Sequence, residues 1–195
     1  MISVHVPATT EPARSAPRAA VQRPEWKETL RDGTTVLIRP IRPSDTEVGR
    51  RFIQDLSPTS RRFRFLGEVT PSVQLLERLT NPDPARDVAF IALIADGARK
   101  SEIGVARFSA RSDGRVCECA VVVSDDWQHR GLGTILMRHL IDVARERGIE
   151  CMYSMDNAEN LGMKELAEHL GFRRLPDPND GAQVLHTLDL KAVTV

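Results

Sequence analysis

The segment that decides the fold reads Val121-Val122-Val123-Ser124-Asp125-Asp126-Trp127-Gln128-His129-Arg130-Gly131-Leu132-Gly133-Thr134. It starts as an apolar, β-branched run and continues through a polar turn and a loop with two glycines. It then leads into residues 135–141, whose apolar side chains recur at helical spacing. The pattern predicts a buried strand, a loop and the start of a helix.

The two glycines of this loop indicate a site for an anion. Gly131 and Gly133 have no Cβ, so the backbone N–H groups around them can come close to a ligand. The helix that follows adds unpaired N–H groups and the positive end of its dipole. A phosphate is the anion that such a loop fits best. The alternative is a helix start that binds nothing.

The spacing differs from that of the common nucleotide-binding loops, since neither G-x-x-x-x-G-K-[ST] nor G-x-G-x-x-G is present. Instead, Gln128-x-x-Gly131-x-Gly133 resembles the pyrophosphate-binding motif of the GNAT superfamily of acyl-CoA-dependent N-acyltransferases. Residues 32–45 look like the opening of many GNAT domains. The string Leu56-Ser57-Pro58-Thr59-Ser60-Arg61-Arg62-Phe63-Arg64-Phe65 is similar to the catalytic domains of Pat-type bacterial protein lysine acetyltransferases.

The remaining chain predicts an α/β (α+β) fold with a mixed central sheet. Strands are expected at residues 35–39, 88–95, 102–108, 116–123, 149–154, 172–175 and 183–190. Helices are expected at 44–56, once or twice within 57–80, at 130–147 and at about 157–170. An antiparallel first part then precedes a parallel crossover. The resemblance implies a GNAT fold with splayed parallel strands and flanking helices over residues 30–190.

Composition bounds the organisation of the chain. Residues 1–27 are rich in Pro, Ala, Thr and Arg and predict a disordered tail, which leaves 28–195 as one GNAT acetyltransferase domain. A net charge of zero argues against nucleic acid as a partner. No apolar run predicts a membrane span or a signal core, so a cytoplasmic location is expected.

The cysteines predict neither a disulfide framework nor a metal site. Cys117 and Cys119 lie in a strand-like run with no second pair at zinc-ligand spacing, and the third cysteine, Cys151, leaves an odd count. We therefore expect buried thiols that act as small hydrophobic side chains, and no metal.

The resemblance implies acetyl-CoA as cosubstrate and assigns residues to it. In the family, backbone N–H groups of the strand meet the pantetheine arm and the acyl carbonyl, the loop holds the pyrophosphate, and an Asn on the last helix contacts the arm. The matching positions are Val121, Val122, Val123, Gln128, His129, Arg130, Gly131, Leu132, Gly133, Thr134 and Asn160. For Asn160, a plain helix N-cap is an equal alternative.

Glu118 is the candidate general base for an amine acceptor. It is the one charged residue in the run 116–123, where it shares a face with Ala120 and Val122. Apolar neighbours are expected to raise the pKa of the carboxyl group, which suits a base that works near neutrality. Pat-type enzymes carry a catalytic Glu at the matching position. The alternative is a Glu on a half-exposed strand face.

The general acid is less well defined. Many GNAT enzymes use a Tyr seven residues after the Asn, and here that position is Ala167. Tyr153, the chain's single tyrosine, is expected to pack rather than react. A CoA thiolate can also leave without an acid, because its pKa is close to the ~8.5 of a cysteine thiol.

The sequence is compatible with several functions. The resemblance favours an acetyl-CoA-dependent N-acetyltransferase that modifies a protein lysine, with a small-molecule amine as the alternative acceptor. A non-catalytic acyl-CoA-binding or sensing module would explain the missing tyrosine. There are three alternatives for the cluster of Arg61, Arg62 and Arg64. It forms a solvated helix face, the rim of the acceptor site, or a contact to a CoA phosphate. A monomer and a homodimer are both compatible with the sequence.

Overall fold

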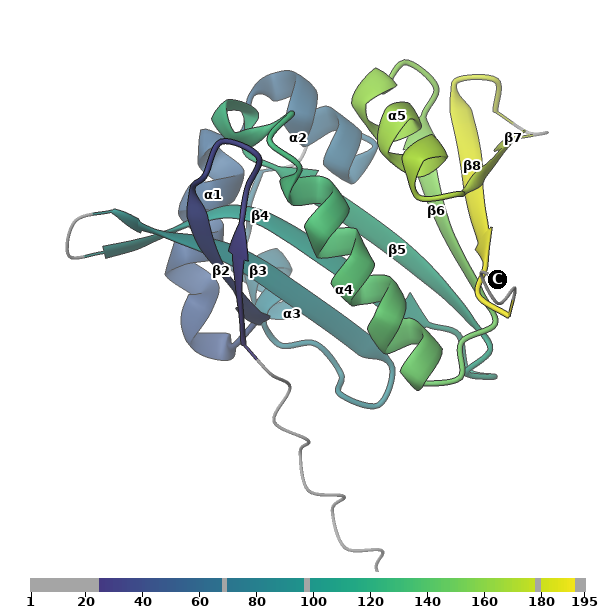
Figure 1. The fold of residues 1–195 in the computed structure, drawn as a ribbon, viewed down its shortest axis with the longest axis horizontal. Helices are drawn as coiled ribbons and strands as arrows, with labels where there is room; N and C mark the ends of the chain where they lie inside the picture. The colour runs from purple at the N-terminus through teal and green to yellow at the C-terminus, as the bar shows by residue number, and fades with distance from the viewer. Residues whose placement is uncertain (1–24, 68–69, 97–98, 178–179, 192–195) are drawn as a thin grey trace, which may run out of the picture.

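The computed structural model describes residues 25–67, 70–96, 99–177 and 180–191. Its strands form a single mixed sheet. They are β1 (Trp26–Thr29), β2 (Thr35–Pro40), β3 (Asp87–Asp96), β4 (Arg99–Ala110), β5 (Val116–Val123), β6 (Cys151–Asn157), β7 (Arg173–Pro176) and β8 (Gln183–Asp189). The strand order is β1-β2-β3-β4-β5-β6-β8-β7, and β5–β6 is the parallel pair (Figure 1). The predicted mixed sheet is confirmed.

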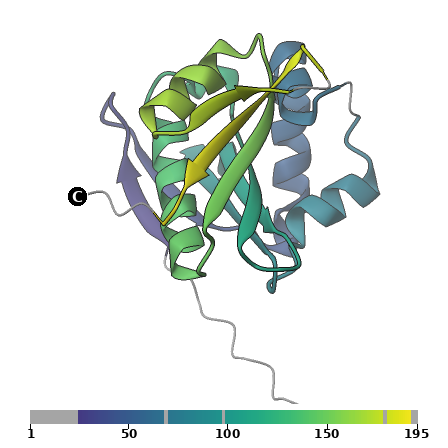
Figure 2. The same ribbon diagram turned by 90° about the vertical axis from the view of Figure 1, so that its right-hand side faces the viewer.

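Helices cover both faces of the sheet. They are α1 (Thr46–Asp55), α2 (Pro58–Phe65), α3 (Val73–Thr80), α4 (Leu132–Glu146) and α5 (Leu161–His169). Helices α4 and α5 lie on one face and α1 to α3 on the other, as the two views show (Figures 1 and 2). All helices expected from the sequence are present, with ends shifted by a few residues.

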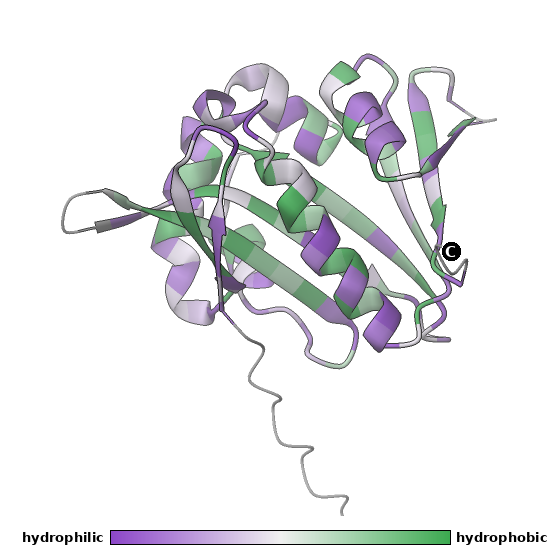
Figure 3. Ribbon diagram, viewed as in Figure 1, coloured by the Kyte–Doolittle hydropathy of each residue, from purple (hydrophilic) through white to green (hydrophobic). Residues whose placement is uncertain are grey.

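The core follows from the amphipathic character of these elements. A large cluster joins the α4 and α5 side of the sheet and includes Phe90, Phe108, Met137 and Met152. A smaller cluster lies under α1 and α3 and includes Phe52 and Leu76. Figure 3 shows α4 striped with hydrophobic and hydrophilic residues above strands that are largely hydrophobic. Burial of apolar surface on both faces therefore holds the two layers of helices to the sheet.

The parallel strands β5 and β6 pair over a short stretch and then diverge. Only the rungs from Val116↔Cys151 to Glu118↔Tyr153 are in register. Beyond them β5 stays paired with β4 up to Val123, while β6 turns toward β8 (Figure 1). The edge of β5 that faces β6 is therefore open from Cys119 onward, which confirms the expected splay.

The sequence prediction was wrong at the start of the domain. The expected disordered tail reached residue 27, but Trp26 and Lys27 belong to β1, which pairs with β2. Trp26 stacks on His139 with ring centroids 4.2 Å apart and meets Phe90 edge-on at 5.2 Å. These contacts come from distant parts of the chain. Residues 1–24 of the predicted tail lie outside the described residues.

None of the helices in the described ranges has the length and apolar character that crossing a bilayer requires.

Candidate active site

The loop between β5 and α4 presents backbone donors that no other group uses. Gly131 is the N-cap of α4 at φ +88°, in the left-handed region that glycine adopts without strain. The first bond of the helix runs from the N–H of Ile135 to the carbonyl of Gly131. No hydrogen bond among the described residues uses the N–H groups of residues 131–134. These four donors converge at a helix N-terminus, which is the geometry that binds a phosphate.

The two glycines of the loop have different structural reasons. Gly131 is needed for its backbone angle, whereas Gly133 lies where α4 packs against α5. A Cβ on Gly133 would come within 3.4 Å of Leu166 on α5. The starts of α4 and α5 therefore lie close together beside the donors, and Leu132 anchors the same turn with a fully buried side chain. Thr134 is half-buried, and His129 is exposed at φ +58°.

The side chain of Gln128 fixes the loop to its surroundings. Its Nε2 donates to the carbonyl of Val123 at 3.2 Å and to Ser60 Oγ at 3.3 Å. Asp125 in the same loop accepts from Ser57 Oγ at 2.8 Å and from Ser60 Oγ at 2.7 Å. Partial burial acts to raise the pKa of Asp125, but the bonds from Ser57 and Ser60 hold that pKa below its usual range. The start of α2 is thus latched to the candidate phosphate loop.

A basic contact to this loop comes from the β1–β2 turn and was missed by the sequence analysis. The Arg31 N–H donates to the carbonyl of Arg130, and the Arg31 side chain lies 3.4 Å from where a Cβ on Gly131 would stand. Arg130 is paired with Asp32 at 2.7 Å and lies over the Trp127 ring. Arg31 therefore brings a second guanidinium to the loop. Nothing in the local pattern of residues 31–33 indicates this long-range contact.

The expected strand edge is present at the splay. Val121, Val122 and Val123 pair with β4 on one side, and the parallel pairing with β6 has already ended. Asn160 caps α5, because its Oδ1 accepts from the N–H of Met163 at 3.0 Å. The N-cap alternative for Asn160 is therefore confirmed. No hydrogen bond among the described residues uses its amide nitrogen.

Glu118 lies on the last rung of the β5–β6 pair, opposite Tyr153. The Tyr153 hydroxyl donates to Glu118 Oε2 at 3.4 Å and accepts from Arg111 at 3.4 Å. The predicted alternation is confirmed, since Cys117 and Cys119 are buried on the opposite face. The expected apolar enclosure of Glu118 is wrong, however. The carboxylate is exposed, because the splay that opens the strand edge also opens the space beside Glu118.

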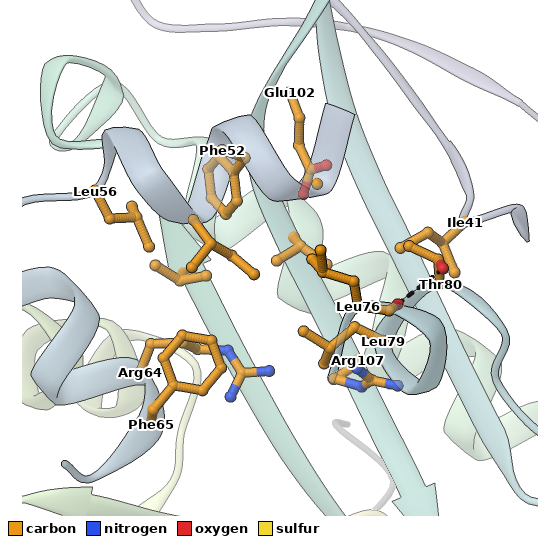
Figure 4. Close-up of a pocket in the computed structure, with 14 residues that line it drawn as sticks. Ile41, Phe52, Leu56, Arg64, Phe65, Leu76, Leu79, Thr80, Glu102 and Arg107 are labelled. Carbon is orange, nitrogen blue, oxygen red and sulfur yellow. Dashed lines mark hydrogen bonds between the residues drawn. The ribbon is translucent and has the colours of Figure 1, made fainter. Parts of the chain in front are cut away.

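The three arginines of α2 have three different environments. Arg61 donates to the carbonyls of Gln54 and Leu56 and so closes the end of α1. Arg62 is exposed and forms an ion pair with Glu159 at 3.4 Å. Arg64 points instead into a cavity beneath α1 and α2 (Figure 4). The solvated-face interpretation therefore holds for Arg62 alone.

Cys117, Cys119 and Ala167 have buried side chains, and the two thiols have the structural role that the sequence predicts. Cys117 and Cys119 are free and buried, and burial raises the pKa of Cys117 to about 12. Ala167 is fully buried in the core beneath α5. The described ranges hold no cluster of three or more His, Cys, Asp or Glu side chains arranged for a metal ion.

Comparison with known proteins gives a consistent assignment. The model of the Acetyltransferase (GNAT) family matches residues 59–172. Acetyltransferase PA5475 of Pseudomonas aeruginosa is 47% identical over 179 residues, which span 91% of this chain and 96% of that protein. The crystal structure of the GNAT domain of S. lividans PAT has a TM-score of 0.76 at 26% identity and covers 90% of this chain and 99% of that one.

Acetyltransferase Pat of Mycolicibacterium smegmatis is a less similar relative, 30% identical over 143 residues. The match spans 73% of this chain and 42% of Pat, so this chain corresponds to less than half of that protein. The resemblance to Pat-type domains is thus confirmed as a distant one within the wider family. With its fold, its open strand edge and its loop of free N–H donors, the chain belongs to the acetyltransferase (GNAT) family and is an acetyl-CoA-dependent N-acetyltransferase.

Proposed function

We propose that the protein transfers the acetyl group of acetyl-CoA to the side-chain amine of a protein lysine, with Glu118 as general base. The observation that supports this proposal most directly is the position of Glu118. It lies where β5 and β6 begin to diverge, one residue before the open edge of β5. The names of two relatives, Pat and the GNAT domain of PAT, support a Pat-like reaction. The resemblance of residues 56–65 to Pat-type domains supports the lysine acceptor.

In this proposal the loop and the strand edge hold the cosubstrate. The free N–H groups of residues 131–134 bind the pyrophosphate, with Gln128, His129 and Arg130 lining the approach. The pantetheine arm lies along the open edge at Val121–Val123 as an added strand would, and the amide nitrogen of Asn160 reaches the arm. Arg31 supplies an additional positive charge at the phosphates.

The reaction needs a base because the lysine amine is mostly protonated at neutral pH, with a pKa of ~10.4. Glu118 takes a proton from the ammonium, directly or through a water molecule. The amine nitrogen then forms a bond to the thioester carbonyl carbon, the C–S bond breaks, and the nitrogen loses its second proton to solvent to give the neutral amide. A backbone N–H of the β5 edge stabilises the negative charge that develops on the carbonyl oxygen.

The leaving thiolate does not need the tyrosine that the family commonly uses. Ala167 stands at that position and is fully buried. The thiolate leaves as the anion and takes a proton from solvent, because its pKa of ~8.5 makes it a moderately stable leaving group. Tyr153 serves to orient Glu118, to which its hydroxyl donates.

The test is thiol release from acetyl-CoA with lysine peptides, polyamines and aminoglycosides as acceptors, with mass spectrometry of the products. Acetylation of lysine side chains, with little turnover of the other amines, is the expected result. Turnover confined to a small amine would replace the lysine acceptor by the alternative one. Saturable acetyl-CoA binding without any turnover would favour the sensing module, for which Ala167 is the supporting observation.

A further inference from the structure

A small cavity lies on the side of the sheet that carries α1, α2 and α3 (Figure 4). Most of its wall is apolar and comes from Phe52, Leu56, Phe65, Leu76, Val105 and Val122. Its volume is about 30 Å³, which is room for about two water molecules, the size of a carboxylate group. Its polar lining comes from Arg64 of α2, Arg107 and Glu102 of β4 and Thr80 of α3. Burial raises the pKa of Glu102 to about 8, so this carboxyl group is mostly neutral at pH 7.

Neither guanidinium group forms an ion pair with a described residue, although the charges of Asp156 and Glu118 act on Arg64 and that of Asp87 acts on Arg107. Both side chains are half-buried, and no hydrogen bond or ion pair joins either of them to another described residue. The Arg64 guanidinium lies over the ring of Phe65, 5.1 Å from its centroid. Two like charges that share a mostly apolar cavity cost free energy unless an anion neutralises them.

This environment disfavours the charged forms of both arginines. Burial lowers the pKa of Arg64 to about 10, and the neighbouring guanidinium of Arg107 acts in the same direction. Burial also lowers the pKa of Arg107, with a weak opposing effect from Asp87. The charged form of each arginine is thus disfavoured in the wall of the cavity.

The cavity borders the proposed reaction centre. Val122 forms part of its wall and also belongs to the strand edge assigned to the acyl group. Glu118, Ala120 and Val122 lie on the same face of β5. Arg107 pairs with Ala120 across the sheet, so Glu118 is on the face that borders the cavity. A ligand anion between Arg64 and Arg107 would consequently lie within a short chain length of the reacting carbon and nitrogen.

We propose that Arg64 and Arg107 form a carboxylate-binding subsite for one of the two substrates of the transferase. The planar forks of the guanidinium groups match the two oxygens of a carboxylate. This inference rests on the proposed function, because it assigns the ligand to the same reaction centre. The carboxylate belongs to the amine acceptor or to the far end of a dicarboxylic acyl group carried by CoA.

A binding experiment tests the subsite without any turnover. Succinate and lysine are titrated into the CoA-bound protein by calorimetry, with cadaverine as the analogue of lysine that lacks the carboxylate. The proteins are the wild type, Arg64→Met, Arg107→Met and the control Arg62→Met, whose side chain is exposed on the same helix. We expect succinate or lysine to bind the wild type and the control, and to bind the two cavity variants about tenfold or more weakly.

Turnover then distinguishes the two sources of the carboxylate. In the acceptor arm, lysine is compared with cadaverine, both with acetyl-CoA. In the donor arm, succinyl-CoA is compared with butyryl-CoA on the best acceptor. In one arm, the wild type should have a kcat/KM about tenfold higher for the substrate that carries the carboxylate. Arg64→Met and Arg107→Met should abolish this preference and leave kcat/KM for the carboxylate-free substrate unchanged.

The subsite is wrong if no carboxylate binds, if the cavity variants bind it as well as the wild type, or if the protein turns over amines and neither arm shows the preference. The outcomes for the proposed function are separate. Turnover of cadaverine without carboxylate binding would refute the subsite and keep the transferase. Carboxylate binding that depends on both arginines, with no turnover of any amine, would keep the subsite and refute the proposed reaction.

Discussion

Glu118 and Tyr153 face each other on the last rung of the parallel β5–β6 pair, with the Tyr153 hydroxyl 3.4 Å from Glu118 Oε2. One residue further along, the strands diverge. The Glu118 carboxylate is therefore attached to the last residue of β5 that pairs with β6 before the open edge. Tyr153 on the neighbouring strand restrains the orientation of this carboxylate. A base that must meet an incoming amine benefits from such preorganisation.

Replacing Tyr153 by Phe tests the orienting role of its hydroxyl. The hydrogen bond to Glu118 is long, so its loss should lower kcat about fivefold, equivalent to ~1 kcal/mol. A tyrosine that donated a proton to the leaving thiolate would cost about a hundredfold or more. Steady-state kinetics of Tyr153→Phe with acetyl-CoA saturating therefore separates the two roles. A loss of the larger size would contradict the account.

Replacing Gly131 by Ala tests the phosphate loop. Alanine at φ +88° is strained by about 1–2 kcal/mol, and relaxation would turn the N–H donors away from the pyrophosphate. The control Gly114→Ala carries a similar strain at φ +67° in the β4–β5 turn. Both variants should lose some thermal stability, but only Gly131→Ala should raise KM for acetyl-CoA, by about tenfold. Equal KM values in the two variants would argue against the loop as the site.

Replacing Asp125 by Ala tests the latch between α2 and the loop. The variant loses three hydrogen bonds from Ser57 and Ser60, and because the group is exposed we expect a cost of about 1 kcal/mol. The neighbouring Asp126→Ala serves as control. The folded pKa of Asp125 is below 3.8, so its contribution is complete above about that value and is lost as the pH falls through the folded pKa. Urea denaturation at neutral and acid pH measures both effects, and equal stabilities of the two variants at neutral pH would refute the latch.

Glu102 gives a prediction about stability and pH. It is buried at 9% exposure, its Oε2 has no partner among the described residues, and burial raises its pKa to about 8. The folded state thus binds more protons than the unfolded state between a pH of about 4.5 and 8, and the contribution of Glu102 to stability falls as the pH rises through that range.

Glu102→Gln removes this titration. When the pH is raised from 5 to 8, the free energy of unfolding of the variant should increase relative to that of the wild type by on the order of 1–3 kcal/mol. Urea denaturation at both pH values measures this change. Glu146→Gln, on the exposed face of α4, should leave the difference between the two pH values unchanged. A wild-type stability with the same pH dependence as the Gln variant would show that Glu102 is ionised in the folded protein.

Local patterns were sufficient to predict most of the fold. The β-branched run of β5 and the helical spacing of α4 are properties of adjacent residues, so their bounds were predicted closely. Strand β1 was not predicted, because only four residues form it and Trp26 is held by contacts with His139 and Phe90. Tertiary packing decided that element rather than local propensity.

The candidate site was likewise predictable where it depends on neighbouring residues, and unpredictable where it depends on contacts between distant ones. The donors of the loop depend on Gly131 and on the helix that follows, both visible in the sequence. The exposure of Glu118, the contact of Arg31 with the loop and the convergence of Arg64 with Arg107 depend on residues far apart in the chain. Asp45 is a further example, since its buried carboxylate is bound by Arg39 at 2.7 Å.

The most direct measurement of the central claim is a comparison of Glu118→Gln with Glu146→Gln and the wild type. Acetyl-CoA affinity is measured by calorimetry, and kcat is measured by thiol release with lysine peptides. The account predicts unchanged affinity in all three proteins and a kcat about a hundredfold to ten-thousandfold lower in Glu118→Gln alone. A Glu118→Gln variant that turns over at the wild-type rate would contradict the assignment of Glu118 as the general base.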